Sequence, residues 1–160
     1  MKNTILIFSV LYSSFIIAQD HFIVEIDATG ESTLFIFQDI ITSLDNGDEL
    51  GLFDLNGNVD NEGNLGEILV GSGVWSNNQL EIVAIMGIDL SEFGGPILPG
   101  ANSGNSMVLK IWKTVEQLEY TATYTIEAGG GTFNDLFTVI SDISCSPGSI
   151  ADECSVSLYR

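Results

Sequence analysis

Hydrophobic and polar residues alternate with a period of two through much of the chain. The clearest case is EYTATYTIE at 119–127, where Tyr, Ala, Tyr and Ile on one face alternate with Glu and Thr on the other. Such alternation is typical of an antiparallel strand with one face in the core and one face in water. The same alternation, or a short apolar run, occurs at residues 21–27, 33–37, 49–53, 67–75, 79–86, 106–113 and 136–141. The pattern therefore predicts about eight short strands.

Turn signals separate these segments at short intervals. Asn46-Gly47 is the pair that favours a tight hairpin turn, and clusters of Asn and Ser at 76–79 and of Gly at 128–132 act similarly. After the first residues of the chain, no window shows the spacing of an amphipathic helix. We therefore expect an all-β protein, an antiparallel β-sandwich of about eight strands, with a jelly-roll-like or an immunoglobulin-like strand order.

The first residues have the features of a secretory signal peptide. Lys2 precedes a mostly apolar run at 5–17, and the chain turns polar after Ala18. The alternative is a membrane anchor, but the run is shorter than the roughly 20 residues of a spanning helix. We expect cleavage after Ala18, a secreted or cell-surface protein, and no membrane insertion of the mature chain. The expected division is a signal peptide at 1–18, a β-sandwich domain at 19–144 and a C-terminal tail at 145–160.

The charge is strongly acidic. Asp and Glu number 22 against 4 Lys and Arg, which gives a formal net charge of −18, and removal of the leader would also remove Lys2. Such a charge repels nucleic acid and anionic lipid, so neither is an expected partner. The hydrophobic fraction of 45% is too high for a disordered acidic chain.

The connection at 54–66 is rich in oxygen ligands. Calcium takes six to eight oxygens from carboxylates, amides and backbone carbonyls. The predicted ligands of a calcium ion here are Asp54, Asn56, Asn58 and Asp60. The spacing differs from that of an EF-hand, because Val59 and Leu65 stand where that loop has Gly and Glu. The alternative interpretation is a solvated turn rich in Asp and Asn.

Two cysteines lie near the end of the chain, Cys145 and Cys154. In a secreted protein, two close cysteines with no others present are most simply one disulfide. Catalytic signals are weak: His21 is the one histidine and lies two residues after the expected mature start. We therefore predict that the protein is not an enzyme.

Aromatic residues offer a second binding hypothesis. Trp75, Trp112, Tyr120 and Tyr124 would form a platform for the apolar face of a surface glycan if one sheet face exposed them. The alternative is packing within the sheet, which is favoured because all four lie inside strand patterns.

The order of motifs resembles a known kind of module. The series is GDELGLFDLNG, LVGSGVW, LEIVAIMGID, PGANSGNSMVLKIWK and EYTATYTIEAGGGTFNDLFTVIS, and it covers most of residues 22–142. This looks like a β-rich module of secreted and cell-surface proteins of Bacteroidetes-type bacteria, which often carry a type IX secretion sorting domain. The resemblance implies an extracellular β-sandwich without established catalytic residues.

Together these features predict a secreted, acidic, non-catalytic structural or adhesive component, and the alternative is a carbohydrate-binding module. The N-terminal segment suggests self-assembly, because Phe22, Val24 and Ile26 align on one face at the free end of the mature chain. Such a strand can close its own sandwich or add to a neighbour's edge, which would give a homo-oligomer or a filament.

Overall fold

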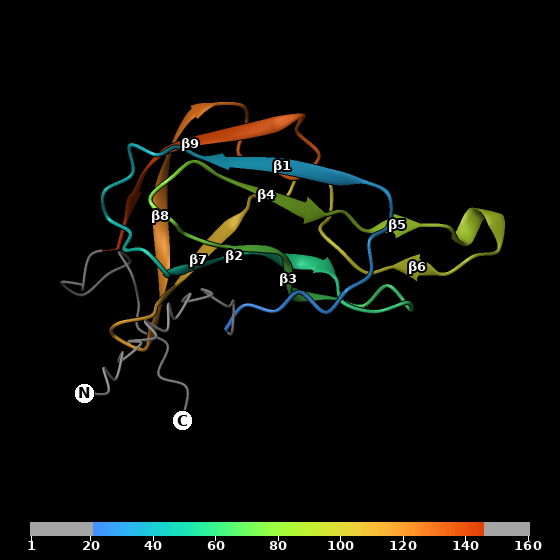
Figure 1. Ribbon diagram of the computed structural model, residues 1–160. Coiled ribbons are helices and arrows are strands. Elements are labelled where there is room, and N and C mark those ends of the chain that lie inside the picture. The colour runs from blue at the N-terminus through green and yellow to red at the C-terminus, as the bar shows by residue number, and fades with distance from the viewer. Residues whose placement is uncertain (1–20, 146–160) are drawn as a thin grey trace, which may run out of the picture.

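A computed structural model of the chain describes residues 21–145 (Figure 1). The predicted signal peptide and nearly all of the predicted C-terminal tail lie outside the described residues. The elements are β1 (Ser32–Phe37), β2 (Glu49–Asn58), β3 (Leu65–Val74), β4 (Leu80–Ile85), β5 (Ile88–Asp89), the 3-10 turn η1 (Ser91–Phe93), β6 (Ile97–Leu98), β7 (Val108–Lys113), β8 (Leu118–Ala128) and β9 (Phe137–Ser144). Between residues 21 and 145, no helix is long and apolar enough to cross a membrane.

The prediction of an all-β fold is confirmed. Each strand predicted from residue 33 onward corresponds to a strand of the structure, and the inward positions follow the period of two. The strand predicted at 21–27 is wrong, because residues 21–30 form no strand. The alternation there has another cause: Phe22 is buried over Gly51 on the outer face of the sheet, Val24 is half-buried, and Ile26 is half-buried against the core.

The prediction of a two-sheet antiparallel sandwich is wrong. The seven long strands form one mixed sheet, in the order β3-β2-β7-β8-β9-β1-β4, which curls into a nearly closed barrel. All of its neighbouring strands are antiparallel except β1 and β9, which are parallel. In Figure 1, β9, β1 and β4 lie above β7, β2 and β3, and β8 runs between these two layers.

Strand β8 joins the two layers into one sheet. It has 11 residues, of which 118–122 pair with β7 and 123–128 pair with β9. The register shifts on either side of Ile126, and such irregularities bend a strand and increase its twist. A single bent strand can therefore belong to both layers, so the sheet turns a corner and does not divide in two.

The barrel comes closest to closing between β3 and β4, which are the two ends of the hydrogen-bonded order and do not pair with each other. Gly71 on β3 allows this close approach: a Cβ at this position would lie 3.0 Å from the carbonyl oxygen of Val83 on β4. Inside the barrel, the core consists of large side chains from every long strand. Those with almost no exposure include Phe35, Phe37, Leu50, Leu52, Val70, Trp75, Leu109, Ile111, Phe133, Ile140 and Ile143.

A small hairpin made of β5, η1 and β6 projects from one end of the barrel (Figure 1). Backbone hydrogen bonds in both directions between Asn58 and Gly100 fix the return of this hairpin to the end of β2. The N–H of Ile97 also donates to the carbonyl of Asn61, which joins the hairpin to the turn between β2 and β3. The predicted loop at 54–66 is shorter than expected, because β2 continues to Asn58 and β3 begins at Leu65.

Candidate functional site

Asp54, the first predicted calcium ligand, is an interior residue of β2 and is 1% exposed. Its carboxylate accepts hydrogen bonds from the backbone N–H of Asn56 at 2.9 Å, from the N–H of Asn102 at 2.8 Å, and from Nδ2 of Asn105 at 2.9 and 3.0 Å. Asn102 and Asn105 belong to the long connection between β6 and β7. The carboxylate therefore fastens this connection to β2.

Asp60 lies in the exposed turn between β2 and β3 and does not join Asp54. Its Oδ1 accepts from the N–H groups of Glu62 and Asn64, and its Oδ2 accepts from Nδ2 of Asn64 at 2.6 Å. The hydrogen bonds from the Asn64 side chain, followed by the one from its backbone N–H, hold the pKa of Asp60 below its usual value. This carboxylate closes a local turn.

Asn56 and Asn58 follow Asp54 along β2. The carbonyl of Asn56 accepts from Nδ2 of Asn102 at 2.9 Å, and Asn58 takes part in the backbone pair with Gly100. Among residues 21–145, no group of three or more His, Cys, Asp or Glu is placed to hold a metal ion. Calcium binding through amide and carbonyl oxygens stays a prediction.

Cys145 is the last described residue, and it packs half-buried against the core. Its predicted disulfide partner, Cys154, lies outside the described residues, so the disulfide stays a prediction.

The aromatic residues do not form one platform. Trp75 is 1% exposed and Tyr120 is 9% exposed, both within the core. Tyr124 donates its hydroxyl to the carbonyl of Met107 at 2.7 Å, and burial raises the pKa of this tyrosine. Trp112 alone of the four lies on the outer face. The prediction that these aromatic residues pack within the sheet is therefore correct for Trp75, Tyr120 and Tyr124.

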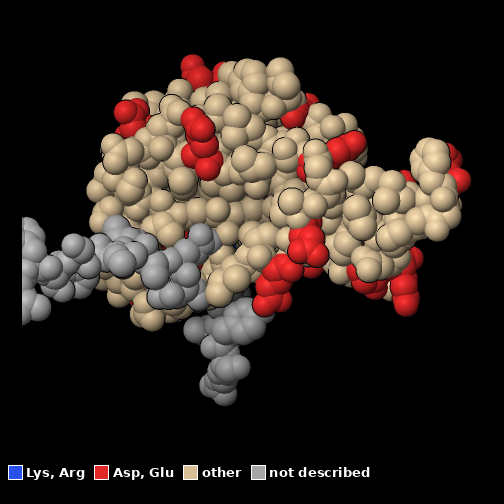
Figure 2. All heavy atoms as spheres, turned by 45° about the vertical axis from the view of Figure 1, so that its right-hand side comes forward, with Lys and Arg blue, Asp and Glu red and all other residues tan. Residues whose placement is uncertain are grey.

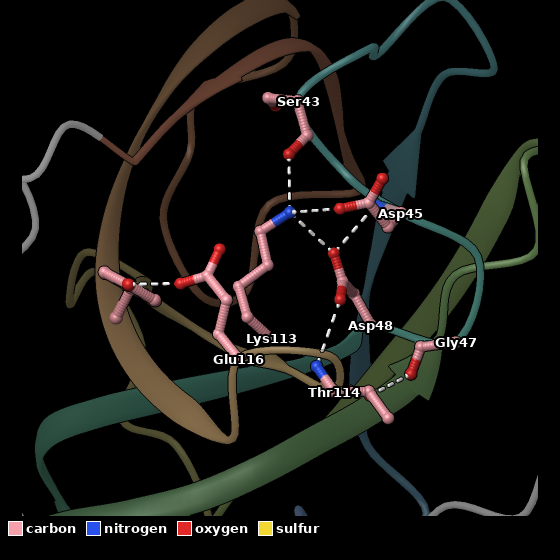
Figure 3. A network of polar contacts seen from close by, with 8 residues as sticks. Ser43, Asp45, Gly47, Asp48, Lys113, Thr114 and Glu116 are labelled. Atoms are coloured by element: carbon pink, nitrogen blue, oxygen red, sulfur yellow. Dashed lines mark hydrogen bonds and ion pairs between the residues drawn. The ribbon is translucent and has the colours of Figure 1, made fainter.

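A polar network fastens the connection between β1 and β2 to the end of β7 (Figure 3). The buried Lys113 donates to Oδ2 of Asp48 at 2.7 Å and to the carbonyl of Ser43 at 2.8 Å, and Oδ2 of Asp45 lies at 3.4 Å. Burial acts to lower the pKa of Lys113, but the hydrogen bond and charge of Asp48, with a smaller effect of Asp45, outweigh burial and raise it. The groups of this network bind one another, so the network holds the connection between β1 and β2 to β7 and stabilises the fold.

The outer surface of β2, β7 and β8 carries a second cluster, which we call the covered face and define by Glu49, Gly51, Trp112 and Glu119. Glu49 on β2 is paired in register with Trp112 on β7, and Trp112 with Glu119 on β8. These three residues therefore form one row across three strands. Gly51 lies on the same face, one step further along β2.

His21 contacts every residue of this row. Its backbone N–H donates to the carboxylate of Glu49, its ring stacks on Trp112 at 3.9 Å with an interplanar angle of 8°, and its Nε2 lies 2.9 Å from Oε2 of Glu119. Phe22 donates its own N–H to Oε2 of Glu49 at 2.9 Å. One buried carboxylate thus binds two successive backbone N–H groups of the N-terminal segment, residues 21–29.

The ring of Phe22 occupies the space above Gly51. A Cβ at residue 51 would lie 2.9 Å from Cγ of Phe22, so the ring reaches this position because the strand has no side chain there. The ring also meets Phe53 edge to face, at 5.7 Å between centroids. Phe22 is 4% exposed as a result.

A pocket of about 400 Å³ lies beside this segment. Lys110 on β7 lines it, with its Nζ 2.5 Å from Glu67, 3.8 Å from Glu119 and 4.3 Å from the centre of the Phe53 ring. Carboxylates and an aromatic ring thus surround one of the two cationic side chains in the described part of the chain. A second pocket, of about 300 Å³, borders the other end of the segment at residues 25–29.

The projecting end of the molecule is the third feature. We define it as the turn between β2 and β3 with its flanking residues, together with β5, η1 and β6. Phe93 at its tip is 87% exposed, and Leu65 and Val59 are 56% and 39% exposed. Figure 2 shows acidic side chains at this end and over the rest of the same face, and no basic side chain is visible there.

The covered face and the contacts of His21 are not evident from the sequence alone. Two signals were present. Gly51 lies inside an apolar strand pattern, which often marks the close approach of another chain segment. Trp112 and Lys110 share the face of β7 that points away from the core.

Comparison of the chain with protein-family models, with curated proteins and with solved structures finds no match. The resemblance to a secreted Bacteroidetes-type module therefore stays a prediction. The fold and the site define an acidic, all-β barrel whose N-terminal segment covers one outer face.

Proposed function

We propose that this protein is a non-enzymatic extracellular component with a structural or adhesive role, and that its projecting end contacts the partner. The observation that carries this proposal is the exposed Phe93 at the tip of a hairpin that stands away from the barrel (Figure 1). Contact with a partner would remove this ring, which is 87% exposed, from water. Burying such a side chain contributes roughly 1.5–3 kcal/mol to the free energy of binding.

The charge around the tip indicates the chemistry of the partner. Asp60 and Glu62 lie on the turn between β2 and β3, Asp89 lies on β5 and Glu92 on η1, all within the projecting end. Acids around an exposed ring favour a partner surface on which an apolar patch is bordered by amines or guanidinium groups. The partner is therefore expected to be a basic protein surface, and screening by salt should weaken the contact.

The buried acids support a role without catalysis. Asp48 accepts hydrogen bonds from Lys113 and Thr114 at the end of β7, and Asp54 on β2 accepts one from Asn102 in the connection between β6 and β7. Each carboxylate thus joins a connection to a strand. Glu49 holds the N-terminal segment in the same way. These carboxylates serve the architecture, which suits a protein that presents a surface.

The test compares two single substitutions of exposed apolar residues at opposite places in the fold. Phe93→Ser removes the ring from the tip, and Val115→Ser removes an 85% exposed side chain from the turn between β7 and β8. Beads coated with each protein are placed on cells of the source organism and on glass that carries amine and phenyl groups. We expect several-fold fewer retained beads for Phe93→Ser and no change for Val115→Ser. Equal retention of the two variants would contradict the proposal.

A further inference from the structure

The N-terminal segment contacts the barrel as a ligand contacts a receptor. It forms no strand, and its anchors are the two N–H groups on Glu49, the ring of His21 on Trp112 and the ring of Phe22 above Gly51. Phe22 is buried, yet it is not part of the core cluster inside the barrel. Of the segment's residues, Ile26 is half-buried against the core cluster. The fully buried core side chains all belong to the barrel, so it keeps them when the segment leaves the covered face.

The segment also has the means to leave. Gly30 connects it to β1 with a φ of +96°, a conformation that favours glycine, and a Cβ at this position would have no atom within 4 Å. Thr29 donates its hydroxyl to the carbonyl of Met86, so the chain is held to the barrel directly before this glycine. Fully extended, residues 21–29 span about 30 Å. A released segment can therefore reach the covered face of another molecule.

Packing beside the segment is incomplete. Pockets of about 400 and 300 Å³ lie along its first and second halves. Ile23, which follows the anchor Phe22 in the segment, is 61% exposed. The attachment thus depends on a few anchor residues in the first half of the segment, which makes exchange possible without loss of the remaining structure.

We propose that the covered face is a docking site for the N-terminal segment of a second copy of this chain, so that copies join by exchanging residues 21–29. In the exchanged form, the segment of one copy makes the same contacts on the covered face of another copy that it makes on its own. Mutual exchange gives a closed dimer, and exchange from each copy to the next gives an open filament. This inference does not rest on the adhesive role, because the covered face and the projecting end share no residue; the second half of the segment borders the projecting end at Asn61 and Leu98.

Protein concentration decides whether the segment docks on its own molecule or on another copy. A segment on a short linker sees its own docking site at an effective concentration on the order of millimolar. Exchange between copies therefore becomes substantial only when the protein itself approaches this concentration, as it would in a surface layer. A dilute solution is expected to contain monomers.

The experiment uses residues 19–160 with Phe22→Ala, which empties the space above Gly51 and leaves the core unchanged. A synthetic peptide of residues 19–29 with the natural sequence is added, and the fluorescence of Trp112 is recorded, while the buried Trp75 supplies a constant background. We expect a saturable change in emission. A peptide with Phe22→Ala should bind about tenfold or more weakly, and a peptide with Ile23→Ala, altered at an exposed position, should bind like the natural one.

The intact protein is then measured by light scattering up to millimolar concentration, with salt present to screen its charge. The average mass of the natural protein should rise with concentration, while Phe22→Ala should stay monomeric and Ile23→Ala should behave like the natural protein. Absence of saturable peptide binding would overturn the inference. Peptide binding together with a natural protein that stays monomeric at every concentration would also overturn it, because the segment would then dock only within its own molecule.

Discussion

Replacing Asp54 by alanine separates its structural contacts from its predicted calcium binding. The carboxylate is 1% exposed and accepts hydrogen bonds from Asn56, Asn102 and Asn105. Hydrogen bonds to a charged acceptor contribute about 1.5–3 kcal/mol each, and a donor left without its acceptor costs about 1–3 kcal/mol. The three donors lie near the surface and can recover part of this through water. We therefore take the lower end, about 3 kcal/mol in total.

A loss of this size is large for a single domain. Stabilities of 5–15 kcal/mol are typical, and for a domain of this length about 3 kcal/mol corresponds to a melting temperature lower by roughly 10 °C. Asp54→Asn keeps one oxygen but places an amide N–H₂ against a donor, so it should also destabilise, by less. Asp60→Ala is the matched control, because that carboxylate is exposed and its partners stay hydrated, and it should change the melting temperature little.

The assay is thermal unfolding followed by circular dichroism, first without calcium. Equal melting temperatures for Asp54→Ala and Asp60→Ala would refute the structural account of Asp54. The natural protein, Asp54→Ala and Asp60→Ala are then heated with millimolar calcium. If the predicted ion is bound, calcium raises the melting temperature of the natural protein by mass action, and Asp60→Ala removes this increase without lowering the starting value. An unmoved melting curve of the natural protein would contradict calcium binding.

Three further outcomes follow from the described groups and from the cysteines. Lys113→Met leaves Asp48 buried without its cation and should cost about 3–5 kcal/mol in urea unfolding. Because the pKa of Lys113 is raised in the fold, its stabilisation is complete below the ordinary lysine pKa and is lost as the pH rises through the raised value; a Lys113→Met protein with the same alkaline loss would contradict this. The disulfide between Cys145 and Cys154 predicts no alkylatable thiol in freshly secreted protein, and two reactive thiols would exclude it. A glycan array should show no binding that depends on Trp75 or Tyr120, since both are buried; loss of a glycan signal on Tyr120→Phe would show otherwise.

Local alternation was sufficient to predict the strands but not the way they join. A period of two records which side of an extended segment is buried, whatever lies on that side. The period of two therefore located β4 and β7 correctly. For the same reason it wrongly predicted a strand at 21–27, where Phe22 is buried against the outer face of the sheet. The barrel depends on the pairing of β8 with both β7 and β9, and the bend at Ile126 is visible only in that pairing.

The predicted calcium ligands illustrate a competition between two signals. Asp, Asn and Gly favour turns, which suggested that the loop begins at Asp54. The period of two was also present, since Leu50, Leu52 and Asp54 share the inward face of β2. Pairing with β3 decided the outcome, because β3 begins at Leu65 and extends the hairpin to Asn58. His21 and Glu119 are 98 positions apart, so no local pattern could bring them together.

The most direct test of segment exchange asks which molecule supplies the segment on each covered face. Isotopically light and heavy forms of the intact protein, with a photo-reactive residue in place of Ile23, are mixed at millimolar concentration and irradiated, and the cross-links to β3 are analysed by mass spectrometry. Ile23 and Leu69 line the same pocket, so the cross-link reports the docked segment. Exchange predicts a substantial share of mixed light–heavy pairs, which reaches half of all pairs if every segment is exchanged, and far fewer after dilution. Cross-links that stay within one isotope at every concentration would contradict it.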